Sequence, residues 1–316
     1  MEKHPKRRRG EKFVFRAQAA EPGTAPIAQG YLARIAENNV APTTEVFAPF
    51  RFEGTDVGNI SVVFAKQLQR FPRVFVVDFP SAITMNPALQ SPEERSDAAA
   101  GVLKELASEG VVTGWRDELY PVLKGFGSPP LLCVERAAAQ LFGITAYGVH
   151  VNGYVTLPNG EKELWVARRS STKPTWPGLL DHIVAGGQPH GISPTANVAK
   201  ECSEEANIPQ DLAETAVAVG AVSYKGVTEG NLKGDVLFCY DLHLPLDFTP
   251  ENMDGEVDEF MRLPLSEVAE LIQTTQDFKP NVNLVIIDFL VRHGFIRPEE
   301  PDYLQIVASL RSGVCA

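Results

Sequence analysis

The sequence is poor in cysteine, in long hydrophobic runs and in positive charge, and each shortage excludes a class of protein. Four cysteines in 316 residues, none in a Cys-x-x-Cys pair, exclude a disulfide-rich scaffold and indicate inert thiols in a reducing compartment. No apolar run approaches the roughly 20 residues that span a bilayer, so no membrane partner is expected. The formal net charge of −11 argues against non-specific binding to nucleic acids.

Several common catalytic motifs are also missing. The chain has no GxSxG nucleophile motif, no HExxH zinc motif and no GxxxxGK[ST] phosphate loop. What remains is an ordinary globular composition, 44% hydrophobic and 22% charged, in a chain long enough for two domains.

The composition changes twice along the chain and predicts three regions. Residues 1–27 carry the basic run Lys6–Arg9 and a Pro/Gly/Ala stretch, which predict a disordered basic tail. Such a run is usually only solvated, so we expect a cytoplasmic location, with a nuclear or organellar address as the alternative. Residues 28–140 read as a smaller mixed α/β domain, and residues 141–316 as a second domain with C-terminal helices.

The region 28–140 shows no constellation of chemical groups, so its expected role is a platform or partial lid for the second domain. Its clearest element is a helix from Ser91 to Gly110, in which Ser91 is the N-cap and Glu94 completes a capping box. The other predicted elements are a short helix at 31–37, a strand and turn at 49–60, a buried strand at 73–79, and a helix from Pro129 to Phe142.

After residue 141 the pattern changes to strands that alternate with turns, followed by helices. Strands are predicted at 147–157, 163–170, 215–224, 234–244 and 256–263, and helices at 194–207, 265–273, 281–293 and 301–310. This order predicts an α/β (α+β) fold, with a mixed sheet covered by helices on both faces.

The most informative stretch joins two glycines, Gly186 and Gly187, to a well-capped helix. Ser193 is a good N-cap, Pro194 suits the first helical position, and Asn207 tolerates the left-handed turn that ends a helix. The sequence therefore predicts a strand, a glycine loop and a short helix in succession.

Three glutamates, Glu201, Glu204 and Glu205, are spaced i, i+3 and i+4 on this helix and share one face. Because like charges at this spacing repel, the face is either simply solvated or it holds a hard cation such as Mg²⁺ or Mn²⁺ through oxygen ligands. Glycine at 186 permits close approach of the backbone to a metal or phosphate. This context favours a metal site.

Cations and aromatics lie between the preceding strand and the glycines. Arg168, Arg169 and Lys173 are candidates for binding an anionic diphosphate, although they could equally be surface cations. Trp176 could stack on a heterocyclic base or merely pack in its loop, and the same alternatives hold for Trp165.

The spacing of this stretch resembles the Nudix box. Gly186 takes the first glycine, Lys200 and Glu201 the Arg-Glu pair, and Glu204 and Glu205 the Glu-Glu pair, with Cys202 and Ile208 in apolar positions. Three positions depart from the pattern: Ile192 replaces a glutamate, Lys200 an arginine and Asn207 a glycine. Lysine keeps the charge but loses the planar fork of arginine.

This resemblance implies a Nudix α/β/α sandwich and a hydrolase acting on phosphoanhydride bonds. It implies that Mg²⁺ or Mn²⁺ is held by the Gly186 carbonyl and by Glu201, Glu204 and Glu205, with a further carboxylate from a later loop. Glu256, in the acidic run Asp254–Glu259, is the first choice for that carboxylate and general base, and Glu259 the second. Lys200 is expected to bind the substrate together with Arg168, Arg169 and Lys173.

Longer segments, among them WVARRSSTKPTWPGLLDHIVAGGQPHGIS and KPNVNLVIIDFLVRHG, are similar to the Nudix subfamily associated with thiamine pyrophosphokinase. The resemblance implies hydrolysis of thiamine diphosphate, or its oxidised or damaged analogues, to the monophosphate. We expect a monomer or a homodimer. Two alternatives stay open. One is a non-catalytic diphosphate-binding module. The other is an isopentenyl-diphosphate isomerase-like enzyme, which would need a catalytic cysteine near the glycine strand, where the sequence has Ala185, Gly186 and Gly187.

Overall fold

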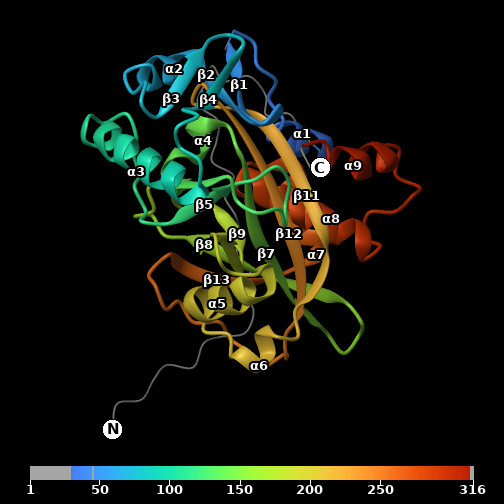
Figure 1. Cartoon of the computed structure of the whole chain (residues 1–316). Helices are drawn as coiled ribbons and strands as arrows, with labels where there is room; N and C mark the ends of the chain where they lie inside the picture. Colours follow the sequence, from blue (N-terminus) through green and yellow to red (C-terminus); the bar gives the residue numbers. More distant parts are fainter. Residues whose placement is uncertain (1–29, 45, 314–316) are drawn as a thin grey trace.

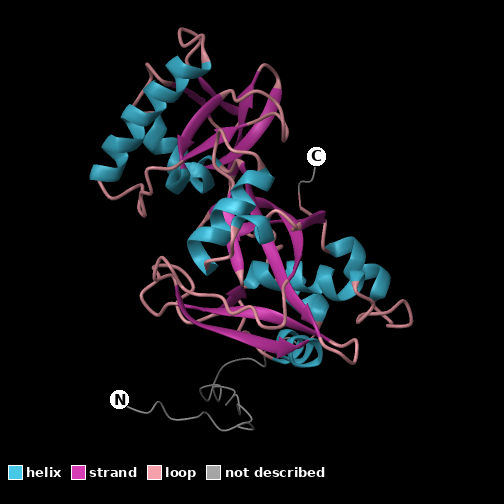
Figure 2. Ribbon diagram, turned by 90° about the horizontal axis from the view of Figure 1, so that it is seen from below, coloured by secondary structure: helices cyan, strands magenta, loops and turns pink. Residues whose placement is uncertain are grey.

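The computed structural model of the chain describes residues 30–44 and 46–313 (Figure 1). The expected basic tail, 1–27, lies outside the described residues. Figure 2 shows two sheets, each with its own helices. Of the helices in the described ranges, none has the length and apolar character needed to span a membrane.

The first lobe contains a four-stranded sheet whose core is aromatic and aliphatic. Its elements are β1 (Phe47–Phe52), β2 (Thr55–Ser61), α2 (Val62–Leu68), β3 (Phe75–Asp78), β4 (Ala82–Met85) and α3 (Pro92–Ser108). The strand order is β2-β1-β4-β3, with only β1 and β4 parallel. The predicted capping box of α3 is confirmed, since Ser91 Oγ accepts from the Glu94 N–H at 3.1 Å and Glu94 Oε2 from the Ser91 N–H at 3.2 Å.

Two expectations for this lobe are wrong. The run at 73–79 forms a strand, but β3 lies at the edge of its sheet, so Phe75 is buried whereas Val76 is exposed. The predicted helix from Pro129 is instead β6 (Leu132–Glu135), which pairs with β5 (Leu119–Val122), and helical structure follows only at η1 (Arg136–Ala138) and α4 (Ala139–Phe142). Leu132 and Val134 are buried on one face of β6, a period-two pattern that outweighs the proline start signal.

The second lobe is built on a seven-stranded mixed sheet. Its strands are β7 (Thr145–Thr156), β8 (Lys162–Arg169), β9 (Leu180–His182), β10 (Val184–Gly187), β11 (Val217–Thr228), β12 (Asn231–His243) and β13 (Val257–Pro264). The main order is β11-β12-β7-β8-β13, with β10 paired to β7 and β9 to β8. β12 and β7 run parallel, and the other pairs are antiparallel. The expected mixed sheet is confirmed.

Helices cover this sheet on both faces, as expected. On one face α5 (Pro194–Ala206) packs with α6 (Gln210–Ala213), and Val198, Cys202 and Ala206 are buried in that core. The other core is built around α7 (Leu265–Thr274), α8 (Pro280–Arg292) and α9 (Tyr303–Ser309). In Figure 1 the four-stranded sheet and α5 stand at opposite ends of the molecule.

One helix near the start of the described chain packs with the second lobe. α1 (Tyr31–Ala36) contacts α7, α8 and α9, and its Ile35 belongs to their core. The segment that follows α1 lies along β11, where the Val227 N–H donates to the Val40 carbonyl at 2.9 Å. Residues 31–40 therefore pack with the second lobe, although they precede the four-stranded sheet in the sequence.

Candidate active site

The glycine strand and the capped helix form as the sequence predicts. Ser193 Oγ accepts from the Ala196 N–H at 3.2 Å, and Asn207 ends α5 in the left-handed conformation with φ of 51°. Because α5 buries its small residues against the sheet, the side of the helix bearing Glu201 and Glu205 faces β10.

Glu201 lies directly against the backbone of Gly186. A Cβ placed on Gly186 would come within 2.5 Å of Glu201 Oε1, closer than real Cβ atoms approach other atoms. The Glu201 side chain is only 13% exposed, and burial raises the pKa of its carboxyl group. Lys200 Nζ, 3.2 Å from Glu201 Oε1, offsets part of this effect. Glycine at 186 is therefore required for the carboxylate to occupy this position.

Glu205 is the most strongly perturbed acid of the helix. Its Oε2 accepts a hydrogen bond from the Ala185 N–H at 2.9 Å. Burial raises the pKa of Glu205 well above its usual range, and the nearby charges of Glu201, Asp181 and Glu256 raise it further. A bound cation would relieve this clustering of negative charge and favour the ionised form.

A later loop brings two more carboxylates to Glu205. Oxygens of Glu205, Asp254 and Glu256 all lie within 4.8 Å of one another. Glu256 is the first of the two glutamates predicted for this role, whereas Glu259, the second, is exposed on β13. Asp254 was not chosen. Its oxygen accepts from the Glu256 N–H at 2.8 Å across Gly255, so the Asp-Gly turn signal could have identified it.

The third glutamate of the helix, Glu204, has a different environment. Its side chain is 54% exposed, and its Oε2 lies 2.7 Å from Lys200 Nζ. Lys200 therefore bridges Glu201 and Glu204, which offsets the like-charge repulsion expected along α5. The structure directs Lys200 toward the carboxylates of its own helix.

The predicted substrate-binding cations lie in unlike surroundings. Lys173 forms an ion pair with Glu256 and so reaches the carboxylate cluster. Arg169 binds Asp181 Oδ2 at 2.9 Å and the carbonyls of the following loop, while Arg168 donates to the Gly178 carbonyl at 3.0 Å. These bonds hold the loop 170–178 against β8.

A small cavity opens between the carboxylates and β8. It is lined by Arg169, Asp181, His182, Ala185, Glu205 and Glu256, among others. Trp176 does not reach it. This exposed tryptophan lines a second, larger cavity of about 490 Å³, which also contacts β11 and the start of α8. The structure thus brings Lys173, Arg169, Glu205 and Glu256 together and leaves Trp176 apart.

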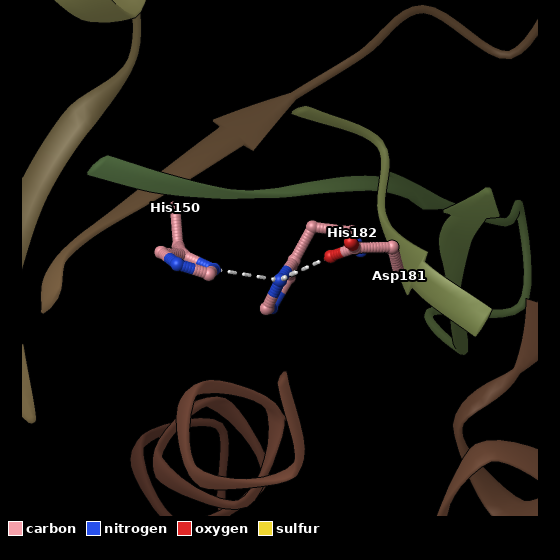
Figure 3. Close-up of side chains that lie close together, drawn as sticks. All are labelled: His150, Asp181 and His182. Carbon is pink, nitrogen blue, oxygen red and sulfur yellow. Dashed lines mark hydrogen bonds and ion pairs between the residues drawn. The ribbon is translucent and has the colours of Figure 1, made fainter. Parts of the chain in front are cut away.

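Beside the small cavity lies a buried histidine pair that no sequence motif predicts (Figure 3). His150 on β7 and His182 on β9 are joined through their Nδ1 atoms at 3.1 Å, and Asp181 Oδ1 is 3.8 Å from His182 Nδ1. Burial lowers the pKa of His182 to about 4 and that of His150 well below its usual range. Both rings are therefore neutral at pH 7, and Asp181 is balanced by Arg169 and Lys279.

Comparison of the whole chain with known proteins identifies the family to which it belongs. A family model for the NUDIX domain matches residues 147–283, and one for a domain of unknown function, DUF4743, matches residues 31–146. Nudix hydrolase 24, chloroplastic, of Arabidopsis thaliana is 49% identical over 271 residues, and Nudix hydrolase 20, chloroplastic, over 278 residues. Each alignment covers 85% of this chain and 74% of the relative. This chain belongs to the Nudix hydrolase family.

Membership of the Nudix hydrolase family confirms two predictions made from the sequence. The fold is a mixed-sheet Nudix domain preceded by an N-terminal α/β region, and the protein is a hydrolase that cleaves phosphoanhydride bonds. Among solved structures, a complex of the C. elegans Ap4A hydrolase aligns with 48% of this chain and 99% of its own, at 14% identity and a TM-score of 0.36.

One expectation needs correction. The cytoplasmic location inferred from the composition is wrong on this comparison, because both Arabidopsis Nudix hydrolases are named as chloroplastic. The basic run that offered the organellar alternative lies outside the described residues.

Proposed function

We propose that this Nudix protein is a Mg²⁺- or Mn²⁺-dependent pyrophosphohydrolase that releases a monophosphate from a diphosphate linked to an organic group. The observation that carries the proposal is that Glu201 and Glu205 lie against the glycine strand, with carboxylate oxygens of Asp254 and Glu256 within 4.8 Å of Glu205. The similarity of its segments to thiamine-associated Nudix proteins supports thiamine diphosphate, or an oxidised or damaged analogue, as the substrate.

The donor set suits a hard divalent cation, because it offers only oxygen ligands and contains a buried carboxyl whose charge needs compensation. In the proposal the Gly186 carbonyl, Glu201, Glu204, Glu205 and Glu256 hold the metal. When bound, a divalent cation neutralises charge on the phosphates and lowers the pKa of a coordinated water.

The remaining residues bind the substrate and move the proton. In the proposal Glu256, or Glu201 as the second choice, accepts the proton of the attacking water. Lys173, already beside Glu256, exchanges that ion pair for a phosphate oxygen of the substrate. Arg168, Arg169 and Lys200 add positive charge around the site. Trp176, which lines the larger cavity, contacts the organic group of the substrate.

The proposal is tested with the purified protein and a panel of thiamine diphosphate, oxidised thiamine diphosphate, ADP-ribose and inorganic pyrophosphate, each with Mg²⁺ or Mn²⁺. We expect thiamine monophosphate and phosphate to appear, and chelation with EDTA to abolish their formation. Binding measured by calorimetry without any product would support the diphosphate-binding module instead. Hydrolysis of the other diphosphates alone would reject thiamine diphosphate as the substrate.

The names of the Arabidopsis relatives also support an organellar location for this protein. Expression of the full chain with a fluorescent tag at its C-terminus tests this, and a diffuse cytoplasmic signal would contradict it.

A further inference from the structure

The N-terminal lobe reaches the glycine loop of the catalytic domain. The Leu119 carbonyl, on β5, accepts a hydrogen bond from the His190 N–H at 3.0 Å. One residue further along β5, the Tyr120 hydroxyl packs on Gly187, where an added Cβ would overlap it. Gly187 directly follows the residue that supports Glu201. The first lobe therefore forms one wall beside the metal-binding carboxylates.

This wall carries an arginine. Arg136, the first residue of η1, has its Cζ 3.2 Å from the position that a Cβ on Gly187 would occupy. Its guanidinium lies 5.5 Å from the centre of the Tyr120 ring, and its Nη1 is 2.6 Å from Glu118 Oε2. Burial tends to lower the pKa of Arg136, but the hydrogen bond to Glu118 and the negative charges of Glu118 and Glu201 help to raise it, so the group stays charged.

The Arg136 guanidinium is fixed in position, but most of its N–H donors have no partner among the described side chains. Of the side chains that the structure describes, only Glu118 forms an ion pair with Arg136, and it engages one of five N–H donors. The Arg136 side chain remains 43% exposed. A planar fork with open donors, fixed on a tyrosine ring beside carboxylates, matches an anion with several oxygens such as a phosphate.

We propose that Arg136 of the N-terminal lobe binds the substrate's diphosphate opposite the carboxylates of α5, so that the active site is completed by both lobes. The inference rests on the proposed diphosphate substrate. It assigns a role to the domain of unknown function: that domain supplies a phosphate-binding cation in addition to Lys200 of the Nudix box. The competing explanation is that Arg136 only neutralises Glu118 and Glu201.

The test compares Arg136→Gln with Arg70→Gln. Arg70 is a matched control, since it lies in the same lobe, is 41% exposed, and binds Glu109 Oε2 through Nη1 at 2.6 Å. For Arg136→Gln we expect KM for the hydrolysed diphosphate to rise about 10- to 100-fold, as expected for a lost charged hydrogen bond, with kcat changing much less. Arg70→Gln should match the wild type, and Arg136→Lys should recover part of the loss.

Calorimetry with imidodiphosphate and Mg²⁺ measures the same contact without turnover. We expect Arg136→Gln to bind this non-hydrolysable diphosphate more weakly by a similar factor, at an unchanged melting temperature. Equal binding by Arg136→Gln and wild type, or no binding by the wild type, would overturn the inference. A wild-type protein that binds imidodiphosphate but hydrolyses no diphosphate would contradict the proposed function alone, because the binding comparison still tests Arg136.

Discussion

The carboxylate of Glu201 occupies the space that a side chain on Gly186 would need. The two residues are 15 positions apart, one on β10 and one on α5, and a Cβ on the glycine would lie 2.5 Å from Glu201 Oε1. This contact couples the strand to the helix at the centre of the proposed metal site, and it gives the first prediction.

Gly186→Ala should abolish activity while preserving the fold. The added methyl group displaces the end of a flexible side chain, so the melting temperature should change little, whereas hydrolysis should fall by at least about 100-fold. Gly101→Ala is the control. Gly101 lies in α3 with open space around its Cβ position, so alanine should leave activity unchanged and stabilise the helix slightly. Wild-type activity in Gly186→Ala would reject the role assigned to this contact.

Glu205→Gln should leave folding intact but reduce turnover by at least about 100-fold. The amide oxygen can still accept the hydrogen bond from Ala185, but it cannot supply a negative charge to a cation. The measurement is kcat at saturating Mg²⁺, with circular dichroism as a check on folding. Glu214→Gln, at an exposed position after α6, should behave as the wild type. A wild-type kcat in Glu205→Gln would refute the assignment.

Asp254→Asn should weaken Mn²⁺ binding by about 10-fold or more, since Asp254 lies within 4.8 Å of Glu205 and Glu256. Titration of Mn²⁺ followed by electron paramagnetic resonance measures this directly. Asp247→Asn, in an exposed loop, serves as the control and should not change the affinity. Crystals soaked in Mn²⁺ should show an anomalous peak beside α5. Its absence would remove the basis of the proposed metal site.

The buried histidine pair should make the protein sensitive to acid. Burial depresses the pKa of His182 from 6.5 to about 4 in the folded protein, so between these values the unfolded chain binds more protons. The contribution of His182 to the free energy of unfolding is therefore fully present above pH 6.5 and is lost as the pH falls toward 4. His182 alone should contribute a loss of about 2 kcal/mol at pH 5.

Urea denaturation at pH 7.5 and pH 5 measures this loss. Replacing His150 and His182 together by leucine should reduce the difference between the two pH values, because neither buried proton acceptor remains. His243→Asn, at an exposed position, should leave the difference unchanged. An equal pH dependence in the double variant and the wild type would show that other groups determine it.

Signals within a few residues of each other predicted the local parts of the site. Ser193, Pro194 and Asn207 define both ends of α5, and the spacing of Glu201, Glu204 and Glu205 places three carboxylates on one side of it. Caps, turns and helical periodicity act over one or two turns of chain, so the sequence by itself determined them. The same spacing carried the resemblance that the family comparison confirmed.

Only the tertiary structure decided which distant groups meet. Asp254 joins Glu205, His150 joins His182, and Arg136 joins Gly187 from the other lobe, in each case through elements far apart in the sequence. The local sequence pattern also gave wrong predictions at β6, expected to be helical, and at β3, expected to be buried. At both places the neighbouring strands determine the conformation and the burial. Such contacts depend on how whole sheets and helices pack, and no short stretch of sequence encodes that packing.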